Sequence, residues 1–174
     1  MQYSFKSCYS EHKMKIKNIK VRFIFEKDVI EKTNKHVIWR NGKSTFSIYR
    51  NSTKFINVTG IKSLQEIKQQ KLAMEKLFKQ NVTSVKIDNI FYSKKDDKNI
   101  DMHLLYTYLK GRKDFFCSYN IELFAGMYLH PSNKVYPTIL LFRTGSYTLM
   151  GCKSLKLILE VEKYVKDLIH MFEK

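Results

Sequence analysis

The chain has 174 residues and 44% hydrophobic content, which is enough for one sizeable domain or two small fused ones and excludes general disorder. Its formal net charge of +16 indicates an anionic partner, either nucleic acid or an acidic membrane surface. An AT-rich coding bias toward Lys, Asn and Ile would produce the same charge without function. No apolar run has the length of a signal peptide or a transmembrane span, and three scattered cysteines predict reduced thiols inside a cell.

The first half alternates polar and apolar residues in short runs that predict strands. Strands are expected over residues 14–25, 35–40, 44–50 and 54–59, with a short helix over residues 26–32. Asn41 and Gly42 predict a tight hairpin with a type I′ turn. Ser63 and Glu66 form a capping box, so a helix should begin there and end near residue 79.

The order of elements then begins again. Asn89 in Ile-Asp-Asn-Ile repeats Asn18 in Ile-Lys-Asn-Ile, and Gly151 in Gly-Cys-Lys-Ser-Leu repeats Gly60 in Gly-Ile-Lys-Ser-Leu. The second half is expected to contain a strand near 85–90, a helix over 100–110, three short strands within 119–153 and a final amphipathic helix. Each copy is then expected to have the order strand, helix, three or four strands, helix.

This duplication predicts an α+β architecture of two pseudo-symmetric halves. We expect an N-terminal extension at residues 1–13, a first repeat at 14–80 and a second repeat at 81–174. A half of about 80 residues buries little core by itself, so the two halves should share one antiparallel sheet with the helices on one face. The strand at 138–142 is apolar on both faces, so its other face should bind a partner.

These motifs, duplicated and in this order, resemble the TATA-binding protein family over roughly residues 14–173. Glu-Leu-Phe-Ala-Gly at 122–126 resembles the family's Glu-Leu-Phe-Pro-Gly, and Leu-Leu-Phe-Arg-Thr-Gly at 140–145 resembles its Leu-Ile-Phe-x-Ser-Gly. Met-Gly-Cys-Lys at 150–153 and Thr-Gly-Ile-Lys at 59–62 stand where the family has Thr-Gly-Ala-Lys. The resemblance implies a saddle, with one curved antiparallel sheet and helices on its convex face.

The resemblance also implies a function in transcription initiation. The concave face of such a sheet binds the AT-rich TATA box in the minor groove, where two Phe pairs wedge between base steps and bend the duplex. By this resemblance Asn18 and Asn89 donate to groove acceptors, and Phe124 forms a wedge with Phe142. The full set of implied DNA-binding residues is Asn18, Lys20, Tyr49, Phe55, Asn57, Thr59, Asn89, Phe91, Phe124, Leu140, Phe142, Thr148 and Met150.

The first half departs from the family pattern. Asn34 stands where one wedge Phe belongs, and Tyr49 takes the place of the other if the turn at residue 51 is two residues longer. Lys20 occupies a position that the family fills with Val, and Met150 replaces the second-half Thr. We therefore expect backbone-driven binding to AT-rich DNA, with the stronger kink at the second-half end.

A partner site follows from the same resemblance. In the family, the second-half stirrup docks a TFIIB-type initiation factor, which in turn leads to RNA polymerase; Tyr119, Glu122 and Leu123 match its positions. A carboxylate beside a DNA-binding edge repels phosphate, so Glu122 fits a protein partner better than DNA, or is a solvated turn residue. We expect no membrane partner, and a nuclear location. The coding bias and divergent first half suggest a large DNA virus, for which a cytoplasmic viral factory or the virion is the alternative location.

Other functions are weighed against this one. No metal or cofactor is expected, because the five histidines share no ligand spacing, and no catalytic motif indicates an enzyme. The main alternative is a protein-interaction module of the same fold that regulates transcription without bending DNA, which the missing first-half wedge favours. The third is an accessory domain of a nucleic-acid enzyme, against which the lack of catalytic residues argues.

Overall fold

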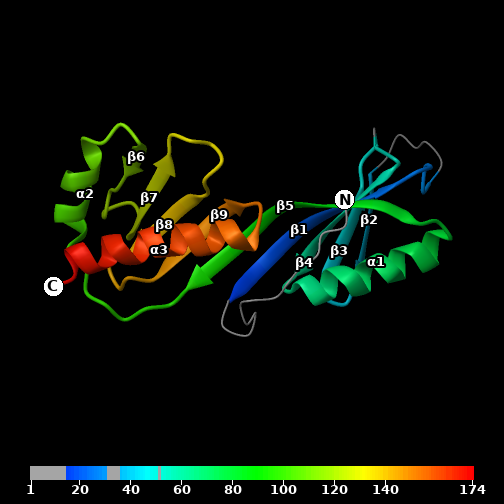
Figure 1. The fold of residues 1–174 in the computed structure, drawn as a ribbon, viewed down its shortest axis with the longest axis horizontal. Coiled ribbons are helices and arrows are strands. Elements are labelled where there is room, and N and C mark those ends of the chain that lie inside the picture. Colours follow the sequence, from blue (N-terminus) through cyan, green and yellow to red (C-terminus); the bar gives the residue numbers. More distant parts are fainter. Residues whose placement is uncertain (1–14, 31–35, 51) are drawn as a thin grey trace.

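One antiparallel sheet runs through both halves of the protein in the computed structural model, which describes residues 15–30, 36–50 and 52–174 (Figure 1). The predicted extension at residues 1–13 and the substituted wedge position Asn34 lie outside these described residues. The described elements are β1 (Ile16–Phe25), β2 (Val37–Asn41), β3 (Ser44–Ile48), β4 (Phe55–Ile61), α1 (Leu64–Phe78), β5 (Val82–Lys94), α2 (Met102–Lys110), β6 (Phe115–Ser118), β7 (Gly126–Pro131), β8 (Thr138–Phe142), β9 (Tyr147–Cys152) and α3 (Leu155–Phe172).

The sheet topology relates the two halves to each other. The nine strands of the described residues follow the order β2-β3-β4-β1-β5-β9-β8-β7-β6, and each neighbouring pair is antiparallel. β1 and β5 therefore lie at the centre. Outward from β1 come β4, β3 and β2, and outward from β5 come β9, β8, β7 and β6, so in each half the last strand lies next to the first. α1 runs along the first half and α3 along the second (Figure 1). This arrangement confirms the expected α+β saddle with one curved antiparallel sheet.

The core lies between the sheet and the helices. Along β1, Ile19, Val21 and Phe23 are buried, and the residues between them are half-exposed, as expected for a strand covered on one face. Ile67 of α1 and Val165 of α3 belong to the same buried cluster as these strand residues. One continuous core thus spans both halves, so neither half needs a complete core of its own.

Both long helices begin at a serine cap. The Ser63 hydroxyl accepts from the Glu66 backbone N–H at 3.1 Å, and the Glu66 carboxylate accepts from the Lys62 N–H at 3.0 Å. Ser154 caps α3 in the same way, by accepting from the Leu157 N–H at 3.2 Å. These bonds satisfy N–H groups that the first helical turn leaves without partners. Ser63 is confirmed as the predicted cap, although the Glu66 carboxylate accepts from Lys62 rather than from Ser63, and α1 begins and ends within one residue of its predicted bounds.

Glu162 of α3 fixes that helix to the central strand β5. Its Oε1 accepts from Lys94 Nζ at 3.1 Å and from the Tyr92 hydroxyl at 3.4 Å, and lies 3.3 Å from Lys166 Nζ. Burial alone would raise the pKa of Glu162, but the bonds and charges of Lys94 and Lys166 outweigh burial and hold this pKa below its usual value. Burial, together with the Glu162 charge, raises the pKa of Tyr92 to about 12. The carboxylate is therefore a charged anchor beneath the sheet.

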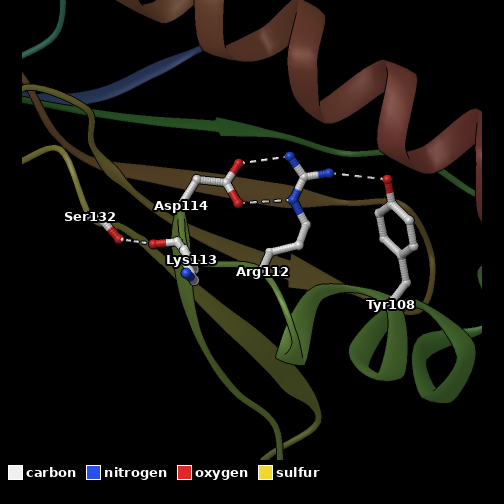
Figure 2. A network of polar contacts seen from close by, with 5 residues as sticks. All are labelled: Tyr108, Arg112, Lys113, Asp114 and Ser132. Atoms are coloured by element: carbon white, nitrogen blue, oxygen red, sulfur yellow. Dashed lines mark hydrogen bonds and ion pairs between the residues drawn. The ribbon is translucent and has the colours of Figure 1, made fainter.

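A polar network holds α2 beside the start of β6 (Figure 2). Arg112 Nε and Nη2 donate to the two carboxylate oxygens of Asp114 at 2.9 and 2.7 Å, and Nη1 donates to the Tyr108 hydroxyl at 3.0 Å. The Ser132 hydroxyl donates to the Lys113 carbonyl at 2.8 Å, which connects the same turn to the end of β7. The beginning of β6, the outermost strand of the second half, is thereby fixed to α2 and to the end of β7.

Two predictions for the first half were wrong. Residues 26–30 contain no helix, whereas the three strands expected at 35–40, 44–50 and 54–59 are present as β2, β3 and β4. The predicted hairpin forms, but its loop residues are Gly42 and Lys43, since Asn41 pairs with Ser44. Of these two only Gly42 has positive φ, at 58°, whereas a type I′ turn needs positive φ at both. Lys43 stays at negative φ because its Cβ disfavours the left-handed region.

Candidate nucleic-acid interface

The sheet face opposite α1 and α3 gathers the side chains predicted to bind DNA. On the central strands Lys20 lies opposite Asn89, and Asn18 lies opposite Phe91. Each of them alternates along its strand with a core residue such as Ile19. These side chains therefore share one face, which we call the open face.

The outer strands extend the open face on both sides. In the first half Thr59 lies opposite Thr45, and in the second half Leu140 lies opposite Thr148. The remaining predicted residues on these strands alternate with core residues in the same way: Phe55 and Asn57 on β4, Phe142 on β8 and Met150 on β9. Asn57 is the exception in exposure, because its neighbours cover it almost completely. The sheet thus brings the predicted groove-lining residues together, while their contact with DNA stays a prediction.

Asn18 and Asn89 are held by the same contact in the two halves. Asn18 Oδ1 accepts from the Gly60 backbone N–H at 2.7 Å, and Asn89 Oδ1 accepts from the Gly151 N–H at 2.9 Å. Because each amide oxygen is occupied by a donor, the amino group of each side chain is left to donate. Gly60 and Gly151 have φ values of 89° and 99°, a region that side chains disfavour, which explains why both copies have glycine there.

A β-bulge precedes each of these asparagines. The register between β1 and β5 shifts between Ile16 and Asn18, and shifts again opposite Asn89, so Lys17 and Asp88 are the extra residues. An extra residue bends the strand and redirects the side chain that follows. The bulges thus explain how both central asparagines reach a glycine on the neighbouring strand.

The second-half wedge pair is assembled around Gly126. The rings of Phe124 and Phe142 meet edge to face with centroids 5.9 Å apart, and Phe124 is 42% exposed. Gly126 pairs with Phe142 across the sheet, and a Cβ built there would lie 2.7 Å from Phe124 Cε1 and 3.0 Å from Phe142 Cε1. The missing side chain of Gly126 therefore gives both rings their space. Gly126 is the last residue of the Glu-Leu-Phe-Ala-Gly motif, and the sequence alone predicted no role for it.

The first half has a different arrangement at the corresponding place. The pair Thr45–Thr59 in the first half corresponds to the pair Thr138–Met150 in the second. Tyr49 follows Thr45 by four residues, as Phe142 follows Thr138, so Tyr49 takes the place of Phe142. Tyr49 is 43% exposed, and the ring of His36 meets it edge to face at 5.1 Å. His36 occupies the position of Gly126, so an imidazole fills the space that the second half leaves for a Phe pair.

An aromatic row beside the wedge was missed by the sequence analysis. Tyr128 stacks on Phe124 at 5.7 Å, His130 stacks on Tyr128 at 6.0 Å, and Phe116 lies 6.1 Å from His130. The two-residue spacing of Tyr128 and His130 on β7 was the available signal, because alternate residues of a strand share a face. The wedge is therefore the inner end of a longer aromatic surface.

Two charged residues on the open face were missed as well. Arg22 of β1 follows Lys20 by two residues, and its guanidinium pairs with Asp88 at 2.8 Å. Alternation along β1 was a signal for Arg22. No sequence pattern indicated Asp88, because its place on the open face depends on the bulge and not on simple alternation along β5.

The predicted partner residues lie in the turn between β6 and β7. Asn120 organises this turn: its Oδ1 accepts from the Glu122 N–H at 3.0 Å, and its backbone oxygen accepts from the N–H groups of Leu123 and Phe124. Leu123 is 84% exposed and Glu122 is exposed beside it, whereas Tyr119 packs on the Tyr106 ring at 6.1 Å. The turn thus presents an apolar and an acidic side chain to solvent, with Tyr119 as its support.

Other kinds of site find no support in residues 15–30, 36–50 and 52–174. No cluster of His, Cys, Asp and Glu in these residues could hold a metal ion. None of the helices described is both long and apolar enough to cross a membrane. Cys152 is a fully buried core residue, and this burial raises the pKa of its thiol to about 12.

Comparison with known proteins agrees with this geometry. The family model "Transcription factor TFIID (or TATA-binding protein, TBP)" matches residues 84–172, slightly more than half of the chain. The TBP of Methanococcus jannaschii superposes with a TM-score of 0.65 at 20% identity, covering 91% of this chain and 98% of that one. No curated protein sequence matches the chain significantly. The family match extends from the central strand to the last helix of the second half, and the chain therefore belongs to the TATA-binding protein family of transcription factors.

Proposed function

We propose that the open face binds AT-rich promoter DNA in the minor groove and bends it, and that the protein then recruits a TFIIB-like factor and RNA polymerase. The observation on which this proposal mainly rests is the matched pair Asn18 and Asn89. Each amide oxygen is used by a glycine N–H, so each amino group can donate outward. The minor-groove edge of A·T pairs offers only acceptors, whereas G·C pairs add an amino donor that opposes such a group.

The charge of the protein supports binding to the DNA backbone. Lys20 and Lys86 lie on the open face, and the chain has a net charge of +16. Lysines that neutralise phosphates release counterions, so the affinity should fall steeply with salt concentration. This term gives affinity without sequence preference, which leaves the preference for AT-rich sites to the asparagines.

The wedge residues support an asymmetric bend. Phe124 and Phe142 can insert between base steps as an apolar pair, which unstacks the step and kinks the duplex. In the first half Tyr49 is packed against His36, and its hydroxyl costs about 1–3 kcal/mol if it is buried without a partner. We propose that the kink at the second-half end is the stronger one.

The exposed turn between β6 and β7 supports the partner part of the proposal. Leu123 offers an apolar anchor, and Glu122 would repel phosphate, so the pair fits a protein better than DNA. We further propose that the protein is not an enzyme and acts in the nucleus, or in a viral factory or virion if it is viral. The matched bulges and asparagines support the division into repeats at 14–80 and 81–174.

The experiment compares Asn18→Asp and Asn89→Asp with the unmodified protein. Aspartate keeps the oxygen that accepts from glycine, so the fold should stay intact, but it loses the amino donor. We expect each variant to lose about tenfold in affinity for an AT-rich duplex in fluorescence anisotropy, which corresponds to about 1.4 kcal/mol. The control is Asn133→Asp, because Asn133 Oδ1 also accepts from a backbone N–H, that of Val135 at 3.0 Å, in an exposed loop.

Two outcomes would remove the proposal. One is equal affinity of the unmodified protein for AT-rich and GC-rich duplexes with no bend in energy transfer between the duplex ends, which would favour the protein-interaction module instead. The other is that both groove variants lose no more affinity for the AT-rich duplex than Asn133→Asp does. The added negative charge alone would then explain the loss.

A further inference from the structure

The ion pair between Arg22 and Asp88 lies on the open face but belongs neither to the asparagine contacts nor to the wedge. Arg22 Nε and Nη2 both donate to Asp88 Oδ2, at 3.2 and 2.8 Å. The Arg22 side chain is 35% exposed and that of Asp88 13% exposed. The pair joins the two central strands, and Arg22 lies opposite Asn57 on one side and Lys86 on the other.

The pair exists in one half only. With Asn18 and Asn89 as corresponding positions, Ser93 corresponds to Arg22 and Lys17 corresponds to Asp88. Neither of these residues can form the same contact, because serine has no charge and lysine has the opposite one. The ion pair therefore breaks the pseudo-symmetry at the centre of the open face.

The guanidinium is fixed on two sides. Asp88 holds it through two hydrogen bonds, and the Arg22 Cζ atom lies 5.9 Å from the centre of the Phe55 ring. A guanidinium has five N–H groups, and the ion pair uses two of them. The other donors remain available while the side chain is prevented from swinging toward the edge of the sheet.

Attraction to phosphate alone does not account for this arrangement. A carboxylate on a DNA-binding face repels phosphate and cancels the charge of its partner, so a lone Lys or Arg would attract the backbone better. Asp88 lowers the positive charge of this face but fixes the orientation of the Arg22 guanidinium. The pair is therefore favourable for DNA binding only if that orientation matters. Direction matters for contacts to base edges, which have fixed positions in the groove.

We propose that Arg22, held by Asp88 and Phe55, is a specificity-determining residue that reads the floor of the minor groove on one side of its centre. The inference rests on the proposed minor-groove function. An A·T pair offers acceptors to the guanidinium, whereas the amino group of guanine opposes it. The narrow groove of A-tracts also has a stronger negative potential, which attracts arginine. Ser93, at the corresponding position of the other half, has no guanidinium to contact the groove floor, so an A·T pair is required on one side only. The ion pair would thereby set the direction in which the protein binds a near-symmetric element.

The test is a scan of single G·C substitutions across an AT-rich duplex, with affinities from fluorescence anisotropy at several salt concentrations. For the unmodified protein we expect one off-centre position at which G·C costs about tenfold or more. In Arg22→Met, which keeps the unbranched apolar stem but removes the guanidinium, the cost at that position should fall about tenfold and the other positions should keep theirs. Asp88→Asn should bind all sequences more tightly, because the face gains positive charge, and should discriminate less at the same position.

Two further variants separate the alternatives. Lys86→Met, on the same face, should weaken binding to all sequences equally and lower the slope of log K against log salt by about one, as expected for a phosphate contact. Arg22→Met/Asp88→Asn removes the ion pair without leaving a charge unpaired, so it tests the inference if Arg22→Met does not fold. Urea unfolding of each variant shows whether the fold is kept.

Each remaining outcome overturns the inference. If Arg22→Met behaves like Lys86→Met, the guanidinium contacts phosphate. If folded Arg22→Met and the double variant keep the scan unchanged, the ion pair is structural. Both results leave the proposed function intact, whereas a lack of AT preference in the unmodified protein would remove the function itself.

Discussion

Replacing Gly126 by alanine tests whether the wedge depends on an absent side chain. The new Cβ would lie 2.7 Å from Leu140 Cδ1, 2.7 Å from Phe124 Cε1 and 3.0 Å from Phe142 Cε1. These separations are shorter than the 3.5–4.0 Å at which carbon atoms attract each other best, so at least one ring must move. Gly126 does not have positive φ, so the backbone accepts alanine and the whole effect comes from the overlap.

The expected cost in stability is small and the expected cost in function is large. Overpacking in a core typically costs 1–3 kcal/mol, but Phe124 is 42% exposed and can swing outward, so we expect about 1 kcal/mol. Moving Phe124 breaks its edge-to-face contact with Phe142, and such contacts are worth about 0.5–1.5 kcal/mol. The wedge then enters the base step as two separated rings, and the bend should decrease.

The assay combines urea unfolding with energy transfer between dyes at the two ends of an AT-rich duplex. Gly111→Ala is the matched control, because Gly111 has a φ of −85° and a Cβ there would have no heavy atom within 4 Å. We expect Gly111→Ala to keep the bend and Gly126→Ala to shift the transfer efficiency toward that of free DNA. If the two variants behave alike in both measurements, the wedge does not depend on the space at Gly126.

The remaining predictions concern the two ends of the sheet, the partner turn and the anchor of α3. Phe142→Ala should remove more of the bend than Tyr49→Ala, and equal losses in the energy-transfer assay would contradict the asymmetric kink. Glu122→Arg should abolish capture of a TFIIB-like factor without lowering DNA affinity, and an unchanged pull-down would exclude this turn as the docking site. Glu162→Gln should lower the free energy of unfolding by on the order of 1 kcal/mol above pH 4.5. Because the pKa of Glu162 is lowered by folding, its stabilisation is complete above the ordinary value of 4.5 and is lost as the pH falls through the lowered value, so the difference from the unmodified protein should shrink in acid urea titrations.

Several features of this protein follow from short stretches of sequence. The Ser63 and Ser154 caps need only residues within one helical turn, and the alternation of β1 assigns its core and open faces without reference to other strands. The repeated Asn and Gly motifs predicted two related halves, and both pairs meet through the same hydrogen bond. Local rules failed where the chain departs from regular geometry, as in the hairpin turn that begins at Gly42 rather than Asn41.

The sequence by itself therefore determined the sheet, its helices, the open face and the family-like pattern of asparagines and wedge residues, because alternation, capping and duplication are local properties. Only the tertiary structure decided which of these residues work together. Gly126 matters because it lies opposite Phe142, and His36 because it lies against Tyr49; both depend on strand register. Arg22 and Asp88 are 66 residues apart and meet because a bulge turns β5 at the central seam. Register and bulges arise from the packing of the whole sheet, so no single stretch of sequence contains them.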